Sequence, residues 1–167
     1  MSSVLETMRT EVVALLPRLR RFARTLTRNA HDADDLVQIA VERALTRHEQ
    51  WRPGSRLDGW LFGILRNAWI DELRARGRRG AIFAPEEAGE HVGEAAMDTE
   101  IEMLAVQAAL AQLPEEQRSA VAMVLIEGLS YKEAAEAMDV PIGTLTSRLA
   151  RGREALQVIL EPRSGET

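Results

Sequence analysis

The sequence predicts an all-α protein made of two small helical domains joined by a flexible linker. Hydrophobic residues make up 46% of the 167 residues and aromatic residues only 4%, and a composition rich in Ala, Leu and Arg favours helices. Apolar residues recur at three- and four-residue steps along most of the chain, which is the spacing of an amphipathic helix. The pattern is interrupted over residues 81–98, where Gly, Ala and Glu dominate. We therefore expect an N-terminal domain over 1–80, a linker over 81–98, a C-terminal domain over 99–161 and a tail over 162–167.

The N-terminal domain is expected to contain three long helices. The first covers residues 12–28, where apolar residues alternate with arginines at helical spacing. The second begins within residues 29–32 and ends near residue 48, and its early carboxylates complement the helix dipole. A Pro-Gly-Ser break at residues 53–55 separates it from a third helix, which begins near residue 57 and ends between residues 74 and 80.

The C-terminal domain is expected to contain four shorter helices. Helical spacing returns from about residue 97 to residue 112, where Leu-Pro stops it. The next helix runs from about residue 115 to residue 127 and is closed by Gly128. Ser130 and Glu133 have the spacing of a capping box, which predicts another helix start. A last helix covers residues 142–160.

Residues 130–153, SYKEAAEAMDVPIGTLTSRLARGR, have the pattern of a helix-turn-helix. Small residues on the first helix and aliphatic residues on the second allow close packing. Asp139 occupies a turn position where Gly is common, and Asp tolerates the left-handed conformation. No acidic residue occurs from 141 to 153, so hydroxyls and arginines on the outward face suit the major groove. The expected DNA contacts are Thr144, Thr146, Ser147, Arg148, Arg151 and Arg153. The alternative is a helical hairpin with a merely solvated polar face.

Charge is distributed unevenly along a chain whose net charge is −5. Residues 1–80 contain 15 Arg and 10 acids, which gives +5, whereas residues 81–116 contain no Lys or Arg and 9 acids, which gives −9. Residues 117–167 contain 6 bases and 7 acids. A basic domain, an acidic middle and a mixed end indicate separate surfaces for separate partners.

The composition argues against an enzyme. The sequence has no Cys, and its three histidines (His31, His48 and His91) are not at metal-ligand spacing. Neither a glycine-rich phosphate loop nor a serine-nucleophile motif is present. We therefore expect no cofactor and no metal. No apolar run is long enough to span a membrane and no secretory signal is recognisable, so a cytoplasmic location without membrane insertion of its own is expected.

Two separate segments resemble the extracytoplasmic-function RNA polymerase sigma factors of the sigma-70 family. Residues 31–45, HDADDLVQIAVERAL, and 57–76, LDGWLFGILRNAWIDELRAR, resemble sigma region 2, and residues 110–153 resemble sigma region 4. The resemblance covers roughly residues 9–160. It implies an alternative sigma factor that directs core RNA polymerase to specific promoters, reads the minus-35 element as duplex and the minus-10 element as melted strand, and is controlled by an anti-sigma factor. It further implies association with the nucleoid when active, and retention at the membrane if the anti-sigma factor lies there.

The resemblance also implies roles for particular residues of the N-terminal domain. The face that binds core polymerase would comprise Asp35, Leu36, Gln38 and Glu42, although the early acids also have a simpler role as helix caps. The surface that captures the melted minus-10 strand would comprise Trp51, Arg52, Ser55, Arg56, Asn67, Ile70, Asp71 and Arg74. Single strands bind through stacking surfaces beside a basic groove, and residues 50–80 contain seven arginines against three acids.

The three tryptophans have different expected roles. Trp60 lies in the apolar stripe and is expected in the core. Trp51 lies beside the loop and either lines the strand-binding pocket or joins the core, with the pocket favoured. Trp69 either supports the same surface or packs on the neighbouring domain.

Two other non-enzymatic functions are compatible with a helix-turn-helix. One is a dimeric DNA-binding regulator, which would give a palindromic footprint without polymerase. The other is a sigma-like decoy that binds an anti-sigma factor and never DNA. Such decoys are joined to a receiver domain, and the arginines retained in residues 50–80 and 141–153 argue against that function.

Overall fold

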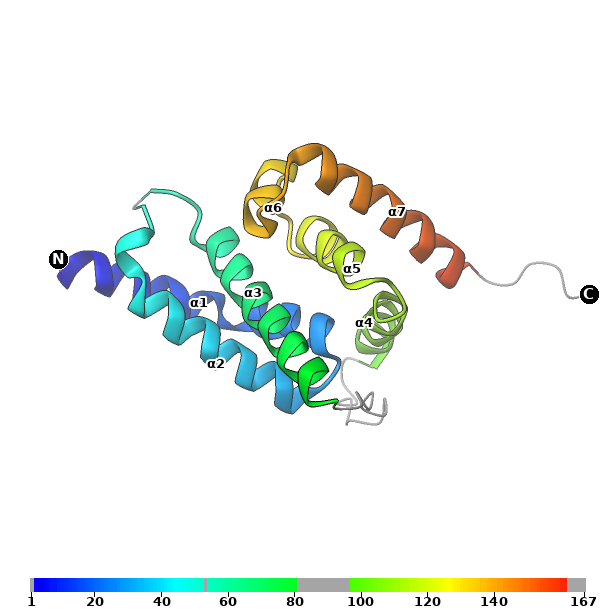
Figure 1. The fold of residues 1–167 in the computed structure, drawn as a ribbon, viewed down its shortest axis with the longest axis horizontal. Coiled ribbons are helices and arrows are strands. Elements are labelled where there is room, and N and C mark those ends of the chain that lie inside the picture. Colours follow the sequence, from blue (N-terminus) through cyan, green and yellow to red (C-terminus); the bar gives the residue numbers. More distant parts are fainter. Residues whose placement is uncertain (1, 53, 81–96, 162–167) are drawn as a thin grey trace, which may run out of the picture.

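The computed structural model describes residues 2–52, 54–80 and 97–161, and every regular element in these ranges is helical. Three helices form a first lobe: α1 (Ser2–Thr27), α2 (Ala30–Thr46) and α3 (Leu57–Arg79), with a short 3₁₀ turn, η1 (His48–Gln50), after α2. The predicted linker over residues 81–98 lies almost entirely outside the described residues. The second lobe contains α4 (Met97–Leu110), α5 (Glu115–Val121), a π-helical turn η3 (Ala122–Ile126), α6 (Tyr131–Met138) and α7 (Ile142–Leu160). Figure 1 shows the two lobes side by side.

Local signals set the helix ends where the sequence predicts them. The Asn29 side chain accepts a hydrogen bond from the Asp32 backbone N–H at 2.9 Å and caps α2. Gly80 ends α3 in the left-handed conformation at φ 68°, which glycine adopts without steric cost. The capping box is present, because Ser130 and Glu133 each accept a hydrogen bond from the other's backbone N–H. Asp139 has φ 56°, as expected for the turn.

One helix differs from its predicted form. The stretch expected as a single helix over 115–127 is α-helical only to Val121 and then forms η3. There the Glu127 N–H donates to the Ala122 carbonyl, five residues back, at 2.9 Å. Such π turns are frequent at functional positions, and this one directly precedes Glu127, whose interactions are described below.

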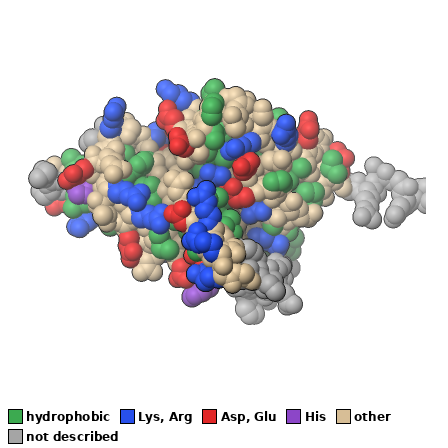
Figure 2. Space-filling view, in the orientation of Figure 1, with side chains coloured by type: hydrophobic (Ala, Val, Ile, Leu, Met, Phe, Trp, Pro, Cys, Tyr) green, Lys and Arg blue, Asp and Glu red, His purple; other side chains and the backbone are tan. Residues whose placement is uncertain are grey.

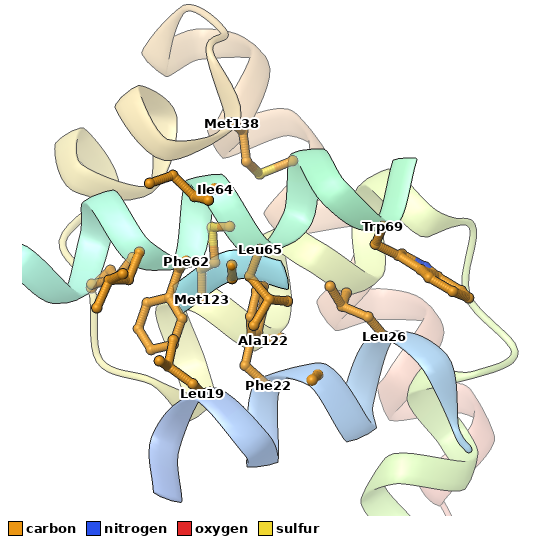
Figure 3. Packing of buried hydrophobic residues seen from close by; sticks show 14 of the residues in the cluster. Leu19, Phe22, Leu26, Phe62, Ile64, Leu65, Trp69, Ala122, Met123 and Met138 are labelled. Carbon is orange, nitrogen blue, oxygen red and sulfur yellow. The ribbon is translucent and has the colours of Figure 1, made fainter. Parts of the chain in front are cut away.

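The hydrophobic cores of the two lobes merge into one cluster. Phe22 of α1 and Phe62 of α3 meet edge to face, with ring centroids 5.0 Å apart. Met123 of η3 and Met138 of α6 are buried in the same cluster, beside residues of α3 (Figure 3). The lobes thus bury apolar surface against each other as well as internally, and burial of this kind stabilises the arrangement.

Candidate nucleic-acid and polymerase interfaces

The helix-turn-helix of α6 and α7 presents its predicted DNA-contacting face to solvent. Leu145 and Leu149 of α7 point into the core, and Gly152 allows α7 to approach α5, because a Cβ there would lie 2.6 Å from the Val121 Cγ2 atom. This packing leaves Arg151 and Arg153 exposed on the outer face. Two of the three arginines of α7 are therefore exposed, and the third, Arg148, is half-buried.

Four of the six predicted contacts on α7 line one shallow hollow of about 530 Å³. Ser147 is exposed, whereas Arg148 is half-buried and lies 3.6 Å from the Glu116 carboxylate. Thr146 is half-buried as a residue, and its hydroxyl donates to the Gly143 carbonyl at 2.9 Å. The residues of the hollow that belong to the predicted set are Thr144, Ser147, Arg148 and Arg151.

Five of the eight residues predicted to capture a melted strand converge on one cleft of about 730 Å³. They come from the segment between η1 and α3 and from the adjoining face of α3, and they are Trp51, Arg52, Ser55, Arg56 and Asn67. Asn67 is exposed and carries both a donor and an acceptor for a base edge. We name this space the interlobe cleft, because helix α6 forms its opposite wall.

The three other predicted residues continue along α3 outside the lining of this cleft. Ile70 is half-buried and Arg74 is exposed. Asp71 is exposed and pairs with Arg43 of α2 at 3.4 Å. At three-, four- and seven-residue steps from Asn67, these residues lie on the same face of α3 as Asn67. They do not line the cleft itself.

The burial of the three tryptophans differs in part from their expected roles. Trp51 is 6% exposed, so it belongs to the core as well as to the cleft wall. Trp60 is only half-buried and also lines the cleft. Trp69 is buried, and the Arg76 guanidinium lies 5.4 Å from the centroid of one of its rings. The assignment of Trp60 purely to the core is therefore too simple.

Two of the seven arginines expected in one basic groove lie elsewhere. Arg66 is 8% exposed and forms a bidentate pair with Glu115 of the second lobe, at 3.0 and 2.9 Å. Arg76 pairs with Asp32 and Glu72 within the first lobe. Because both are held by carboxylates, the groove in this arrangement is less basic than the sequence suggests.

The face predicted to bind core polymerase lies on α2, beside a shallow groove between α1 and α2. Gln38 and Glu42 line this groove and Asp35 is exposed next to it. The prediction that Leu36 contacts core polymerase requires a correction. Leu36 is 3% exposed and packs in the core, so in this arrangement it supports the exposed residues of α2 and cannot itself contact a partner.

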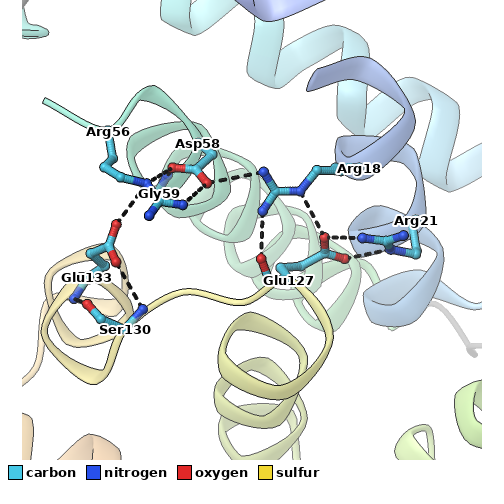
Figure 4. Close-up of polar contacts among 8 residues, drawn as sticks. All are labelled: Arg18, Arg21, Arg56, Asp58, Gly59, Glu127, Ser130 and Glu133. Atoms are coloured by element: carbon cyan, nitrogen blue, oxygen red, sulfur yellow. Dashed lines mark hydrogen bonds and ion pairs between the residues drawn. The ribbon is translucent and has the colours of Figure 1, made fainter. Parts of the chain in front are cut away.

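A chain of alternating charges connects the two lobes at their junction (Figure 4). Arg18 of α1 donates to the Glu127 carbonyl at 2.6 Å and to the Asp58 carboxylate at 3.1 Å. Asp58 also accepts from Arg56, whose Nε lies 3.2 Å from Glu133 of α6. In order, the chain is Arg21, Glu127, Arg18, Asp58, Arg56 and Glu133; we name it the charge chain.

Sequence reasoning missed most of the charge chain. Asp58 looks like an ordinary acid in the first turn of a helix, and Glu127 like a polar residue at a helix end. Both are buried, at 6% and 5% exposure. Only the three-dimensional approach of segments more than a hundred residues apart brings Arg18 to Glu127, so no local pattern could have indicated the pair.

The environment of Asp58 favours its ionised form. Burial of the carboxyl would raise its pKa, but hydrogen bonds from Arg56, the Gly59 backbone N–H and Arg18 act in the opposite direction, and the net pKa is lowered. An ionised carboxylate here holds Arg18 and Arg56 on the same side of the junction.

Arg118 is another polar residue at the junction between the lobes that the sequence analysis did not identify. Its guanidinium donates to the carbonyls of Leu110, Ala111 and Leu113, at 3.0, 3.3 and 2.9 Å. It also donates to the Leu26 carbonyl at the end of α1, at 3.1 Å. Burial lowers the pKa of this arginine, yet four carbonyls compensate the buried charge.

Neither a metal site nor a membrane span is found in the described part of the chain. Within it, His, Asp and Glu nowhere form a group of three that is able to hold a metal ion. None of its helices is long and apolar enough to cross a bilayer.

Comparison with known proteins matches one family to each lobe. The family "Sigma-70 region 2" matches residues 12–79, and the family "Sigma-70, region 4" matches residues 103–156. The "ECF RNA polymerase sigma factor EcfG" of Rhodopseudomonas palustris is 37% identical over 155 residues, covering 93% of this chain and 86% of its own. This chain belongs to the extracytoplasmic-function sigma factor family, whose members are transcription initiation factors and not enzymes.

Solved structures of similar fold include a sigma factor in complex with an anti-sigma factor. The sigma factor RpoE of Bartonella quintana, solved with the anti-sigma factor NepR, is 31% identical with a TM-score of 0.78, over 95% of this chain and 99% of the other. CnrH, solved with the cytosolic domain of CnrY, has a TM-score of 0.71 over 98% of this chain and 96% of the other. At 21% identity, the second similarity shows the fold alone.

Proposed function

We propose that this sigma factor divides promoter recognition between its lobes. Helix α7 reads the minus-35 element as duplex through Thr144, Ser147, Arg148, Arg151 and Arg153, with Thr146 beside them. The wall of the interlobe cleft that belongs to the first lobe, together with Ile70, Asp71 and Arg74, holds the melted minus-10 strand. The exposed face of α2 (Asp35, Gln38, Glu42) binds core polymerase.

One observation carries this proposal more than any other. Five of the residues predicted to contact the melted minus-10 strand lie together on the first lobe. Four of the residues predicted to contact the minus-35 duplex lie together on the second lobe. The α7 surface is a shallow hollow whose lining includes the exposed Ser147 and Arg151, and hydroxyl and guanidinium groups suit base edges and phosphates of the major groove. The first-lobe surface is a cleft lined by aromatic, arginine and amide groups, which suits unstacked bases.

Transcription in vitro tests the proposal. Run-off transcription with purified core polymerase over a promoter library should give a defined set of promoters, and the double variant Arg148→Glu/Arg151→Glu should lose selection at the minus-35 positions. A single base contact is worth about 1–3 kcal/mol at one promoter position. Gln157→Glu, an exposed position on the same helix, serves as the control. Unchanged promoter selection in the double variant would refute the minus-35 assignment.

The minus-10 assignment needs its own variant. Asn67→Ala should reduce permanganate reactivity of unpaired thymines at the minus-10 element while the minus-35 preference remains. Equal melting by wild type and variant would contradict a role for Asn67 in strand capture.

Control by an anti-sigma factor forms part of the same proposal. Its support is the sigma factor RpoE of Bartonella quintana, which was solved in complex with an anti-sigma factor. That sigma factor is 31% identical to this chain, and the match covers 95% of this chain. We infer that the chain works in the cytoplasm, at the nucleoid when active, and that its inhibitor determines any retention at the membrane. Adding the purified inhibitor should abolish run-off transcription, and persistent transcription at saturating inhibitor would argue against such control.

A further inference from the structure

An acidic residue lies in the surface of the second lobe that we propose to face duplex DNA. Glu116 of α5 lines the hollow of about 530 Å³ together with Thr144, Ser147, Arg148 and Arg151 of α7. The Glu116 side chain is 62% exposed, so its charge is open to whatever enters the hollow. A carboxylate in this place repels the phosphates of duplex DNA and weakens their binding.

The Glu116 carboxylate faces the guanidinium of Arg148. Its Oε2 atom lies 3.6 Å from the Arg148 Nη2 atom, and the Arg148 side chain is 22% exposed. This distance is too long for a hydrogen bond but allows an ion pair. Among the described residues Arg148 forms this ion pair alone, and Arg151, three residues further along α7, has no acidic partner. The contact therefore distinguishes one arginine of the hollow from the other.

The charge of Glu116 is unusual for its place on the molecule. Basic and acidic side chains are interspersed over the face seen in Figure 2, so an acid beside a base is common elsewhere on the surface. The stretch 141–153 contains no acidic residue, and Glu116 is the one acid among the residues that line the hollow. The negative charge at this DNA-facing surface is thus supplied by α5 and not by α7 itself.

Two simpler roles do not require a carboxylate inside the hollow. An ion pair with a largely exposed partner adds little to stability. An acid in the first turn of α5 complements the helix dipole, but the adjacent Glu115 already does so, and it bonds to Arg66 and Ser119 away from the hollow. The position of Glu116 therefore indicates a role at the DNA-facing surface.

We propose that Glu116 increases base selectivity at the minus-35 element by orienting Arg148. The inference rests on the proposed minus-35 role of α7. A guanidinium that rotates freely binds any phosphate within reach, whereas one held on one side by a carboxylate directs its remaining N–H donors at a base edge. The same carboxylate weakens contact with every duplex, because phosphates are present in all sequences. Glu116 is thus a positioning residue that lowers general affinity and raises discrimination.

Transcription by the reconstituted holoenzyme tests the proposal, with a promoter library whose minus-35 element is randomised and whose minus-10 element is fixed. Arg148→Ala first identifies the positions at which base preference depends on Arg148. At these positions Glu116→Gln should lower the preference by about three- to tenfold, which is part of the roughly five- to 150-fold preference that one bidentate contact gives. The same variant should stay active at higher salt than wild type, because one repulsion is lost.

Two further variants separate orientation from charge. Glu154→Gln, at an exposed position of α7 outside the hollow, removes the same charge and should leave the base preferences as in wild type. Glu116→Asp keeps the charge and the first-turn acid of α5, but its side chain is one methylene shorter and loses the contact with Arg148. This variant should lose base preference without gaining salt tolerance.

The outcomes separate this inference from the proposed function. Unchanged preferences in Glu116→Gln at positions that respond to Arg148→Ala would overturn the inference. An equal loss of preference in Glu154→Gln, or the absence of any minus-35 position that depends on Arg148, would overturn it as well. The minus-35 role of α7 is judged separately, by whether the double variant Arg148→Glu/Arg151→Glu loses promoter selection.

Discussion

Arg21 and Glu127 form a bidentate ion pair between the two lobes, with nitrogen–oxygen distances of 3.0 and 2.7 Å. The Glu127 side chain is fully buried, whereas the Arg21 side chain is 38% exposed. The pair therefore fixes one carboxylate inside the junction while water still reaches the guanidinium. Glu127 also accepts from Arg18, so one acid serves two basic residues of α1.

Glu127→Ala should weaken the junction between the lobes. The change leaves Arg18 and Arg21 without their carboxylate, and we expect a loss of about 1–3 kcal/mol in the free energy of unfolding, since both arginines can recover some hydration. Urea denaturation followed by circular dichroism measures it. The exposed Glu154 of α7 provides the control, and Glu154→Ala should change stability by less than about 0.5 kcal/mol. Equal midpoints for the two variants would refute a stabilising role for Glu127.

Acid should destabilise the protein partly through Asp58. The folded-state pKa of this carboxyl lies below its ordinary value of 3.8, so its stabilising effect is fully present above that value and is lost as the pH falls through the lowered pKa. Melting temperatures measured between pH 5 and pH 2 should therefore fall less steeply in Asp58→Asn than in wild type. Parallel curves for the two proteins would show that Asp58 contributes nothing to the acid dependence.

Asp139, which is in the left-handed conformation at the helix-turn-helix turn, should respond differently to two substitutions when the melting temperature is measured. Asp139 has φ 56°, a conformation that costs a β-branched residue about 1–2 kcal/mol. Asp139→Val should lower the melting temperature, whereas Asp139→Gly should leave it equal or raise it. A lower melting temperature for the glycine variant than for the valine variant would contradict this explanation of the turn.

Two glycines of α7 should respond oppositely to the same change. At Gly152 an added Cβ would lie 2.6 Å from the Val121 Cγ2, whereas at Gly143 nothing lies within 4 Å. Gly152→Ala should destabilise by about 1–3 kcal/mol through overpacking. Gly143→Ala should be neutral or stabilising by up to about 1 kcal/mol, because Ala favours helix. Thermal unfolding of both variants compares them directly, and a stable Gly152→Ala would show that α5 and α7 can separate at low cost.

The sequence predicted the helices of both lobes well because their ends depend on neighbouring residues. The capping box at Ser130 and the start of the last helix at Ile142 were both predicted correctly. The π-helical turn after Val121 was not predicted, since its backbone pattern gives no distinct hydrophobic spacing. The extension of α1 back to Ser2 was also missed, because the apolar stripe used to define this helix begins at Val12.

Helical spacing alone could indicate a candidate surface on a single helix, whereas the residues of the cleft, which come from a loop and from α3, were named from the family resemblance. The exposed arginines of α7 follow from the helical spacing of residues 141–153 alone. The burial of Leu36 and of Arg66, in contrast, depends on what packs above them. Arg66 in particular looks like one more base in an arginine-rich helix, and only the position of Glu115 on the other lobe determines its partner.

The four carbonyls that accept hydrogen bonds from Arg118 make this single side chain a tie between three helices. Three of the hydrogen bonds stay within the second lobe and join the end of α4 to α5, while the fourth reaches the Leu26 carbonyl at the end of α1. The position of α4 and the packing of α1 against α5 are therefore coupled through one guanidinium, and loss of that group would leave acceptors of both lobes unsatisfied at once.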